Sequence, residues 1–389
     1  MRTVTHNAGY IKEYNRKQVL GLLRSGSLSR AELARRTGLT RAAISVIAEE
    51  LLADGLVEER AERSVSASKG RSPTPLVLSS SGVYAVGTYL CRDGCRMGLV
   101  NLRGEVSCQR ALTPEEIRQP ETALERIAFL VRDILNDSGV PSERLLGLGL
   151  SCPGPVDAGA GRLLDPPGFE AWHHVPIADI LVQKTGFDVR IENNAYSLAL
   201  SEKSYGNARD LEDYMLLLVD TGIGSGLISQ GRLFAGAHGF SGEIGHTSIR
   251  FDGERCSCGN RGCFELYAAI PNLLRSFGLP YAAWGETVRR ARKGEPDAAA
   301  VLRREADILA TGILNAATFL DIEAVLLDGD LLEAFDLLQK PIEETVNGIG
   351  LARSYGRVRI LSASGGDHHR VQAAANIQFN RFLTPGACG

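Results

Sequence analysis

The sequence reads GEIGHTSIRFDGERCSCGNRGCFE from Gly242 to Glu265, and this stretch has the most specific residue pattern in the 389-residue chain. It holds three of the eight cysteines, Cys256, Cys258 and Cys263, and His246 lies ten residues before the first of them. Three cysteines and one histidine are a common tetrahedral ligand set for zinc, and the intervening glycines permit tight turns. Because four protein ligands close the coordination sphere, we predict a structural zinc rather than a catalytic one. Reduced structural cysteines, or redox-sensing thiolates, are the alternatives.

Short apolar runs alternate with helical patterns on both sides of this stretch. Two strand-rich α/β lobes account for that alternation. The predicted strands include residues 84–87, 97–100, 145–150, 214–219 and 324–327, and the predicted helices include residues 121–136, 195–205 and 296–319. We therefore expect residues 82–389 to form one large two-lobed domain.

Several motifs in this domain resemble the ROK family of repressors and sugar kinases. They are SCPGPV at Ser151–Val156, ENNA at Glu192–Ala195, DTGIGSG at Asp220–Gly226, GEIGH at Gly242–His246 and the cysteine stretch that ends at Glu265. The resemblance covers essentially the whole chain and implies an actin-like (ribonuclease H-like, sugar-kinase-type) fold with a sugar held between the lobes. The sugar-binding residues that it implies are Asn193, Asn194, Glu243, His246 and Glu265. All five side chains can pair with hydroxyl groups.

The motifs that a sugar kinase needs for phosphoryl transfer are altered. Where the family's kinases carry an aspartate as the base, this chain carries Asn194, and an amide cannot accept the proton. Tyr89 stands at the aspartate of the first phosphate motif, and Gly329 alone remains of a glycine pair against the adenosine, although the turn Asp220–Gly226 is kept. We expect no catalytic residue and no bound ATP; an active ATP-dependent sugar kinase is the alternative. Gly168 stands where a family asparagine is expected, which leaves the identity of the sugar open.

The first 80 residues have the pattern of a winged helix-turn-helix domain. Ser29 and Glu32 have the spacing of a capping box, and Gly38 can enter the left-handed conformation of a tight turn between helices. Thr40 is the expected N-cap of the helix that follows. We predict helices at residues 15–24, 29–37 and 41–53, and a two-stranded wing from residues 56–59 and 76–78.

The first turn of the third helix in such a motif faces base edges in the major groove. We therefore predict DNA contacts from Thr40, Arg41, Ala42, Ala43 and Ser45, and from Arg71 at the basic tip of the wing. Residues 1–81 hold 13 Lys and Arg against 8 Asp and Glu, whereas the remainder holds 30 against 38. A basic head suits double-stranded DNA as a partner. A protein-interaction or dimerisation module of three helices is the alternative.

The composition, 44% hydrophobic and 23% charged, is that of a globular protein, and no apolar run approaches the roughly 18 residues of a membrane span. We expect a cytoplasmic protein without a membrane partner. The whole pattern predicts a transcriptional regulator, a repressor, whose kinase-like domain binds a sugar or sugar derivative as effector without phosphorylating it. A domain that binds a protein partner instead is the alternative. A homodimer or homotetramer would read a palindromic operator.

Overall fold

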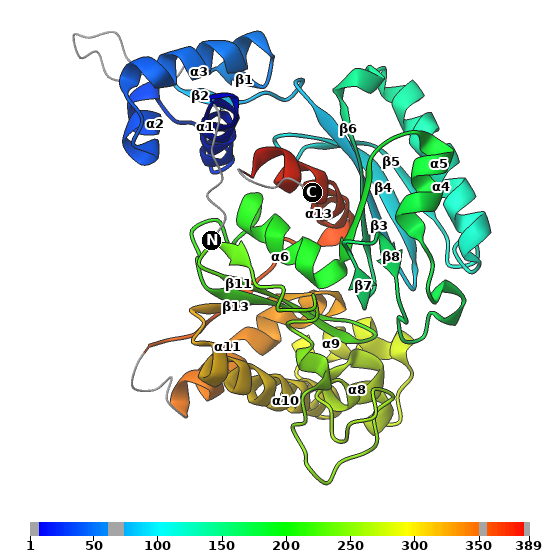
Figure 1. The fold of residues 1–389 in the computed structure, drawn as a ribbon. Coiled ribbons are helices and arrows are strands. Elements are labelled where there is room, and N and C mark those ends of the chain that lie inside the picture. Colours follow the sequence, from blue (N-terminus) through cyan, green and yellow to red (C-terminus); the bar gives the residue numbers. More distant parts are fainter. Residues whose placement is uncertain (1–7, 61–73, 350–355, 385–389) are drawn as a thin grey trace.

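The computed structural model describes residues 8–60, 74–349 and 356–384. A small head stands on a body of two lobes, and the first lobe lies between the head and the second lobe (Figure 1). This arrangement confirms the predicted multidomain fold of a winged helix-turn-helix followed by two α/β lobes. In the described ranges, no helix is both long enough and apolar enough to cross a membrane.

The head contains the three predicted helices and the predicted wing. Its elements are α1 (Ala8–Leu23), α2 (Arg30–Thr37), α3 (Arg41–Ala53), β1 (Val57–Glu59) and β2 (Leu76–Leu78). Ser29 and Glu32 form the reciprocal capping box, Gly38 has a φ of 73°, and the Thr40 hydroxyl accepts from the Ala43 N–H, all as predicted. The strands β1 and β2 pair antiparallel.

Helix α1 begins at Ala8, earlier than the predicted start at Asn15. An ion pair ties these extra turns to α3, because Lys12 Nζ lies 2.7 Å from Glu50 Oε1, and Arg16, in the predicted part of the helix, also pairs with Glu50 at 3.1 Å. The apolar periodicity of the sequence shows no such charge pairing between helices. The early start was therefore missed.

Each lobe is built on a five-stranded sheet with the same strand order. The first sheet runs β5-β4-β3-β6-β9 and the second β12-β11-β10-β13-β14, so each has an antiparallel meander on one side and two parallel strands on the other. The first-lobe strands are β3 (Tyr84–Cys91), β4 (Gly94–Asn101), β5 (Val106–Leu112), β6 (Leu145–Cys152) and β9 (Val189–Asn193). The second-lobe strands are β10 (Tyr214–Val219), β11 (Ile223–Ser229), β12 (Arg232–Leu233), β13 (Ala324–Asp328) and β14 (Arg359–Ser362). This repetition is the structural basis of the two-lobed body.

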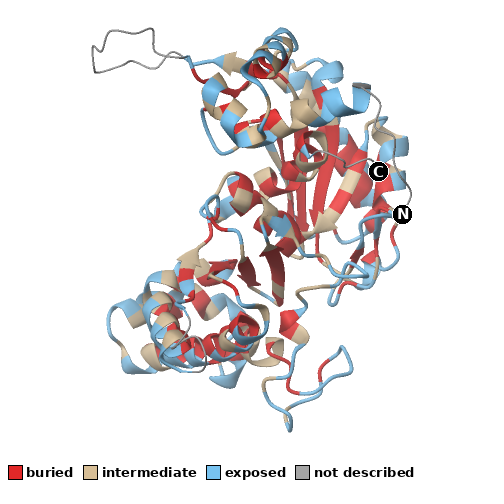
Figure 2. Ribbon diagram, turned by 60° about the vertical axis from the view of Figure 1, so that its left-hand side comes forward, coloured by how far each residue is buried: buried red, intermediate tan, exposed pale blue. Residues whose placement is uncertain are grey.

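Helices cover both sheets, and the buried residues gather in the sheets and in the faces of the helices against them (Figure 2). The first lobe has α4 (Pro120–Ser138) and α5 (Ile177–Thr185). The second lobe has α7 (Glu265–Ala268), α8 (Ile270–Ser276), α9 (Trp284–Arg292), α10 (Pro296–Leu320) and α11 (Phe335–Gly348). Each lobe has its own apolar core, so the two lobes are separately packed units.

Two helices connect the lobes and the head. Helix α6 (Asn194–Ser204) follows the last strand of the first lobe, and α13 (Gly366–Leu383) follows the last strand of the second lobe and returns to the first sheet. The close approach of α13 requires glycine on the sheet, because a Cβ at Gly87 or Gly149 would overlap its backbone. Val371, Ala375, Phe379 and Leu383 of α13 also belong to the apolar core of the head. The head therefore shares its core with the body.

Helix α10 buries one carboxylate that has no partner. Glu305 is fully buried, and neither of its oxygens has a hydrogen-bond partner in the described chain. Burial raises the pKa of Glu305 well above its usual value. The folded state then keeps a proton that the unfolded chain loses above about pH 4.5, so this residue destabilises the fold increasingly as the pH rises.

We expect Glu305→Leu to raise the free energy of unfolding at pH 8 by about 1–3 kcal/mol, because it removes an unsatisfied buried polar group. Thermal melts at pH 5 and pH 8 measure this, and the gain should shrink at the lower pH. The matched variant Glu305→Gln removes the titration but keeps the polarity, so its gain should be smaller. A lower melting temperature for Glu305→Leu at pH 8 would contradict this account.

Candidate functional site

The four predicted metal ligands lie together in the second lobe. One ligand atom from each of His246, Cys256, Cys258 and Cys263 lies within 4.8 Å of all the others. Cys256 Sγ is 3.7 Å from His246 Nδ1, and Cys258 Sγ is 3.6 Å from Cys263 Sγ. Ligand atoms around a tetrahedral zinc lie about 3.5–3.8 Å apart, given Zn–S of about 2.3 Å and Zn–N of about 2.0 Å. The donor set and its spacing fit zinc.

The loop that carries these ligands depends on backbone geometry that glycine supplies. Cys256 N–H donates to Asn260 O and Gly259 N–H donates to Cys256 O, which closes a tight turn around the thiols. Gly262 has a φ of 60°, and a Cβ there would overlap the Arg250 backbone. Burial raises the pKa of Cys263 to about 12, which is unfavourable for a thiolate unless a cation is bound beside it. A metal would hold this loop against the rest of the lobe.

The boundary between the lobes, where the proposed cleft would lie, brings together residues that are far apart in the sequence. A Cβ at Gly154 would overlap the Asn193 amide and lie 4.0 Å from Glu243 Oε1, so Asn193 and Glu243 face one small space. Burial in the cleft raises the pKa of Glu243, as does nearby Glu265, whereas His246 lowers it. Glu265 Oε2 accepts from the Ile223 N–H at 2.8 Å, which leaves its second oxygen for another donor. These residues offer hydroxyl-binding groups on one surface.

His246 can serve both the metal and the cleft. Its Nδ1 is the atom beside Cys256, so Nε2 is left for a partner on the other side of the ring. His246 N–H donates to Glu243 O at 3.1 Å, so His246 and Glu243 lie in one tight turn. A metal on Nδ1 would therefore fix the orientation of a group that faces the cleft.

Asn194 is held by the protein itself. Only 7% of it is exposed; its Oδ1 accepts from the Ser151 hydroxyl at 2.7 Å, and its Nδ2 donates to Leu90 O at 3.2 Å. One N–H and one lone pair of the amide remain. Next to it, burial raises the pKa of Glu192 to about 7.

The residues at the altered phosphate motifs form part of the core. Tyr89 is 2% exposed, and the Arg370 guanidinium lies 5.6 Å from its ring centroid. Gly329 has a positive φ of 90°, and a Cβ there would overlap Val219 O, so both the backbone conformation and the space require glycine. Its N–H donates to Asp328 Oδ1 at 2.7 Å. These positions contribute packing and a backbone turn.

Arg92 is a cleft residue that the sequence did not indicate. It lies between β3 and β4 and joins the lobes: its Nε donates to Pro167 O at 2.9 Å, and its Nη1 donates to Thr221 Oγ1 at 3.3 Å. A Cβ at Gly168 would lie 3.4 Å from Arg92 Nε, so the guanidinium lies where a side chain at position 168 would extend. No spacing rule connects these residues, which only the fold brings together.

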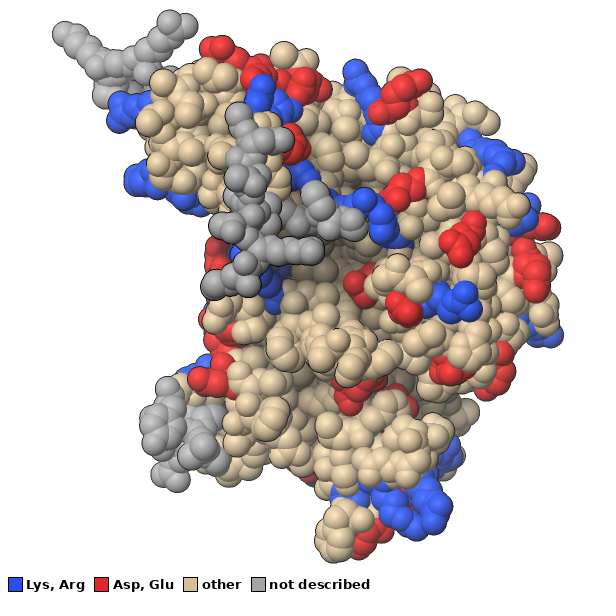
Figure 3. Space-filling view, viewed as in Figure 1, with Lys and Arg blue, Asp and Glu red and all other residues tan. Residues whose placement is uncertain are grey.

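The predicted DNA-contacting residues lie at the outer surface of the head. Thr40, Arg41 and Ala42 are exposed, and Ala43 and Ser45 are partly exposed. Arg41 has no ion pair within the described part of the chain, and Lys and Arg side chains gather on the outer edge of the head (Figure 3). Its guanidinium is therefore available to a phosphate or a base.

One exposed residue of α3 was not among the predicted DNA contacts. Val46 is 56% exposed and lies one turn after Ala42 on the same face, so the i, i+4 spacing could have identified it. An exposed valine there can contact a thymine methyl group. Arg71, predicted at the tip of the wing, lies outside the described residues.

Comparison with known protein families gives one match in the body and one in the head. Residues 87–380 match the model of the ROK family, and residues 14–65 match a model of the MarR family. The chain is 26% identical to the xylose repressor of Bacillus subtilis strain 168 over 96% of this chain and 97% of that protein. It is 28% identical to the DNA-binding transcriptional dual regulator NagC of Escherichia coli K12, over 88% and 86%.

Solved structures show the same folds. A ROK family transcriptional regulator, described as a homologue of the E. coli MLC protein, superposes with a TM-score of 0.80 at 24% identity, over 96% of this chain and 98% of that chain. The ROK hexokinase of Thermus thermophilus superposes with a TM-score of 0.63 at 27% identity, over 75% and 97%. The repressor-type structure thus spans nearly the whole chain, and the kinase three quarters of it.

Proposed function

The chain belongs to the ROK family, and from that premise we propose that it is a cytoplasmic transcriptional repressor that binds DNA through its head and a sugar effector through its cleft. The observation that carries the proposal is a helix-turn-helix with an exposed, unpaired Arg41 on a body that shares its core with that head. The Bacillus subtilis relative is named a xylose repressor and NagC a DNA-binding transcriptional dual regulator, and the related Escherichia coli O157:H7 protein is named an N-acetylglucosamine repressor.

The effector site that we propose consists of Asn193, Asn194, Glu243, His246 and Glu265. The shared space beside Gly154 and the electrostatic coupling of Glu243 with His246 and Glu265 support it. A structural zinc on His246, Cys256, Cys258 and Cys263 would orient the edge of this site. A dimer would place two recognition helices about 34 Å apart, or a multiple of that, on a palindromic operator.

Selection of duplexes from random DNA by the full chain, repeated with D-xylose, D-glucose and N-acetylglucosamine, tests this proposal. We expect enrichment of a palindromic sequence and a change in its affinity with at least one sugar. Failure to enrich any duplex at moderate salt would contradict the proposal that the chain is a DNA-binding regulator. If a duplex is enriched, but no sugar changes its affinity and no sugar gives heat in a calorimetric titration, a body that binds a protein partner is favoured.

An active sugar kinase is a second candidate, because the glycine turn Asp220–Gly226 is retained and a ROK hexokinase has the same body fold. We expect no ADP release above background with hexoses, pentoses or amino sugars. The physical reason is that Asn194 cannot act as a base, and loss of a base costs typically about 10²–10⁴-fold in rate. Turnover that Asn194→Ala abolishes would establish the kinase instead.

A further inference from the structure

One arginine of the head is bound to the body only through neutral groups. Arg24, directly after α1, donates from Nη1 to Asn380 Oδ1 at 2.6 Å and from Nη2 to Asn376 Oδ1, both on α13. Its guanidinium also lies 5.3 Å from the centroid of the Tyr205 ring. In the described ranges it has no carboxylate within ion-pair distance, and its buried Nε lacks a partner. Arg24 Nη2 also donates to the Tyr205 hydroxyl at 3.5 Å, so Tyr205 meets Arg24 through both its ring and its hydroxyl.

Tyr205 is the C-cap of α6, and the other end of this helix lies in the cleft. The N-cap of α6 is Asn193, whose Oδ1 accepts from the Ala195 N–H at 2.8 Å. The 11 residues of α6 span about 16 Å as a single helix. Asn193 and Tyr205 therefore cap the two ends of one helix, so a displacement of the whole helix would move both residues.

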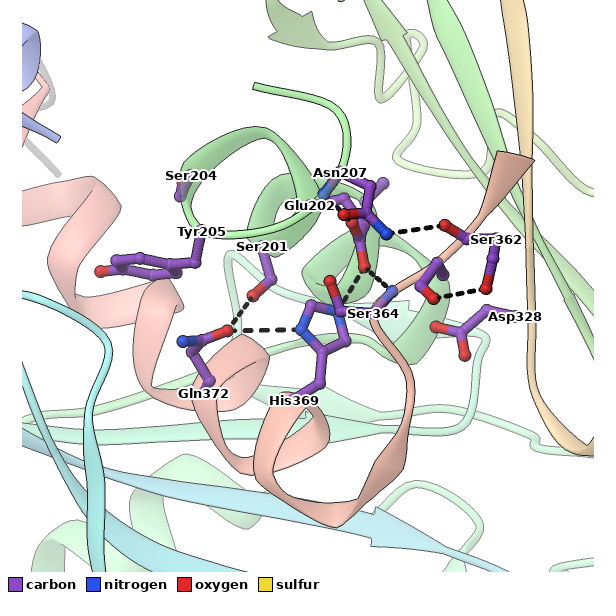
Figure 4. A network of polar contacts seen from close by, with 12 residues as sticks. Ser201, Glu202, Ser204, Tyr205, Asn207, Asp328, Ser362, Ser364, His369 and Gln372 are labelled. Carbon is purple, nitrogen blue, oxygen red and sulfur yellow. Dashed lines mark hydrogen bonds and ion pairs between the residues drawn. The ribbon is translucent and has the colours of Figure 1, made fainter. Parts of the chain in front are cut away.

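The last turn of α6 forms hydrogen bonds and an ion pair with α13 and with the segment that follows β14, and Figure 4 shows this network. Glu202 Oε1 lies 3.0 Å from His369 Nε2 of α13 and accepts from the Ser364 N–H at 2.6 Å. Burial alone would raise the pKa of Glu202, but the bonds from His369 and the backbone lower it overall. Asn207 also donates to Ser362 O, at the end of β14. The C-terminal end of α6 thus joins α13 and the second lobe.

The head–body junction beside Arg24 and Tyr205 is not closely packed. A cavity of about 610 Å³ opens there, and its lining includes Arg24, Tyr205 and Arg103. Tyr205 therefore borders open space on one side. The ring is also the only α6 side chain among the described contacts of Arg24.

We propose that Arg24 and Tyr205 are positioning residues that transmit the state of the cleft to the head through α6. The inference rests on the proposed function, because it requires that the head binds DNA. An effector that moves Asn193 would rotate or shift the Tyr205 ring, and Arg24 would carry that shift to α1 and hence to the recognition helix.

A double-mutant cycle tests this without knowledge of the effector. Gly154→Ala places a methyl group against the Asn193 amide, whose oxygen accepts from the Ala195 N–H, and so disturbs the N-cap of α6. We expect Gly154→Ala to change the affinity of the full chain for its selected operator by at least about 5-fold, the lower range of allosteric coupling. In an Arg24→Gln or Tyr205→Leu background the same substitution should change affinity less than about 2-fold. If the two sites are not coupled, Gly154→Ala changes the operator affinity by the same factor in every background.

Tyr205→Phe keeps the ring beneath Arg24 but removes the hydroxyl that accepts from Arg24, so a retained wild-type ratio assigns the coupling to the ring and a lost ratio assigns it to the hydrogen bond. Circular dichroism melts confirm that each variant is folded. Equal effects of Gly154→Ala with and without Arg24, or no effect of Gly154→Ala in the wild type, would overturn the inference. If the wild type selects no operator at all, the proposed function itself fails, which is a distinct result.

Discussion

Cys263→Ser is expected to abolish stoichiometric zinc and to weaken sugar binding by about 10–100-fold. The thiol is fully buried between Cys258 and the loop backbone, so a hydroxyl there cannot replace it as a soft ligand. Loss of the metal would free His246 and the segment that leads to Glu265, and removal of groups that orient a site costs typically that much. Metal analysis of the purified chain, thermal melting and sugar titration measure the three effects.

Cys108→Ser is the control for this variant, because Cys108 lies on β5, away from the cluster. It should retain one zinc per chain and the wild-type melting temperature. A purified wild type without zinc, whose melting temperature a chelator leaves unchanged, would contradict the metal site. If Cys263→Ser loses zinc but keeps the wild-type sugar affinity, the metal does not orient the sugar-binding residues.

Arg41→Ala is expected to weaken binding to the selected operator by about 10–100-fold, the equivalent of about 1–3 kcal/mol for a base contact. Arg41 is exposed at the start of α3 and has no partner in the described chain. Fluorescence anisotropy at several salt concentrations measures the loss. If Arg41 reads a guanine, specificity at one base pair relaxes and the salt slope stays the same; if it binds a phosphate, the slope falls by about one.

Arg289→Ala is the matched control for the loss of one positive charge. Arg289 lies on α9 of the second lobe, where it pairs with Glu286 at 2.6 Å. It should bind the operator like the wild type. Equal losses for both variants would mean that general charge, rather than the recognition helix, governs binding.

The features that the sequence predicted well are local ones. The capping box at Ser29, the turn at Gly38 and the helix that follows Thr40 depend on residues within four positions of one another, and the structure has all three. The metal ligands lie in one short loop plus His246, and they also come together as predicted.

The features that the sequence missed depend on contacts that only the tertiary fold creates. Arg24 meets Asn376 and Asn380 across more than 350 positions, and no periodicity relates them. Asn194 was predicted to bind sugar, and the sequence did not indicate that Ser151 also donates to its oxygen from another strand. Arg92, in the loop between β3 and β4, lies where a side chain at position 168 would extend. Long-range pairing of this kind is what defines the cleft and its connection to the head.

The most direct test of the central claim is the affinity of the full chain for its selected operator, measured by anisotropy while D-xylose, D-glucose or N-acetylglucosamine is titrated. Coupling between the cleft and the head predicts that at least one sugar changes the operator affinity by about 5–150-fold. It also predicts that the sugar remains unphosphorylated when ATP is present. Operator affinity that stays constant at saturating concentrations of a sugar that demonstrably binds would contradict the account.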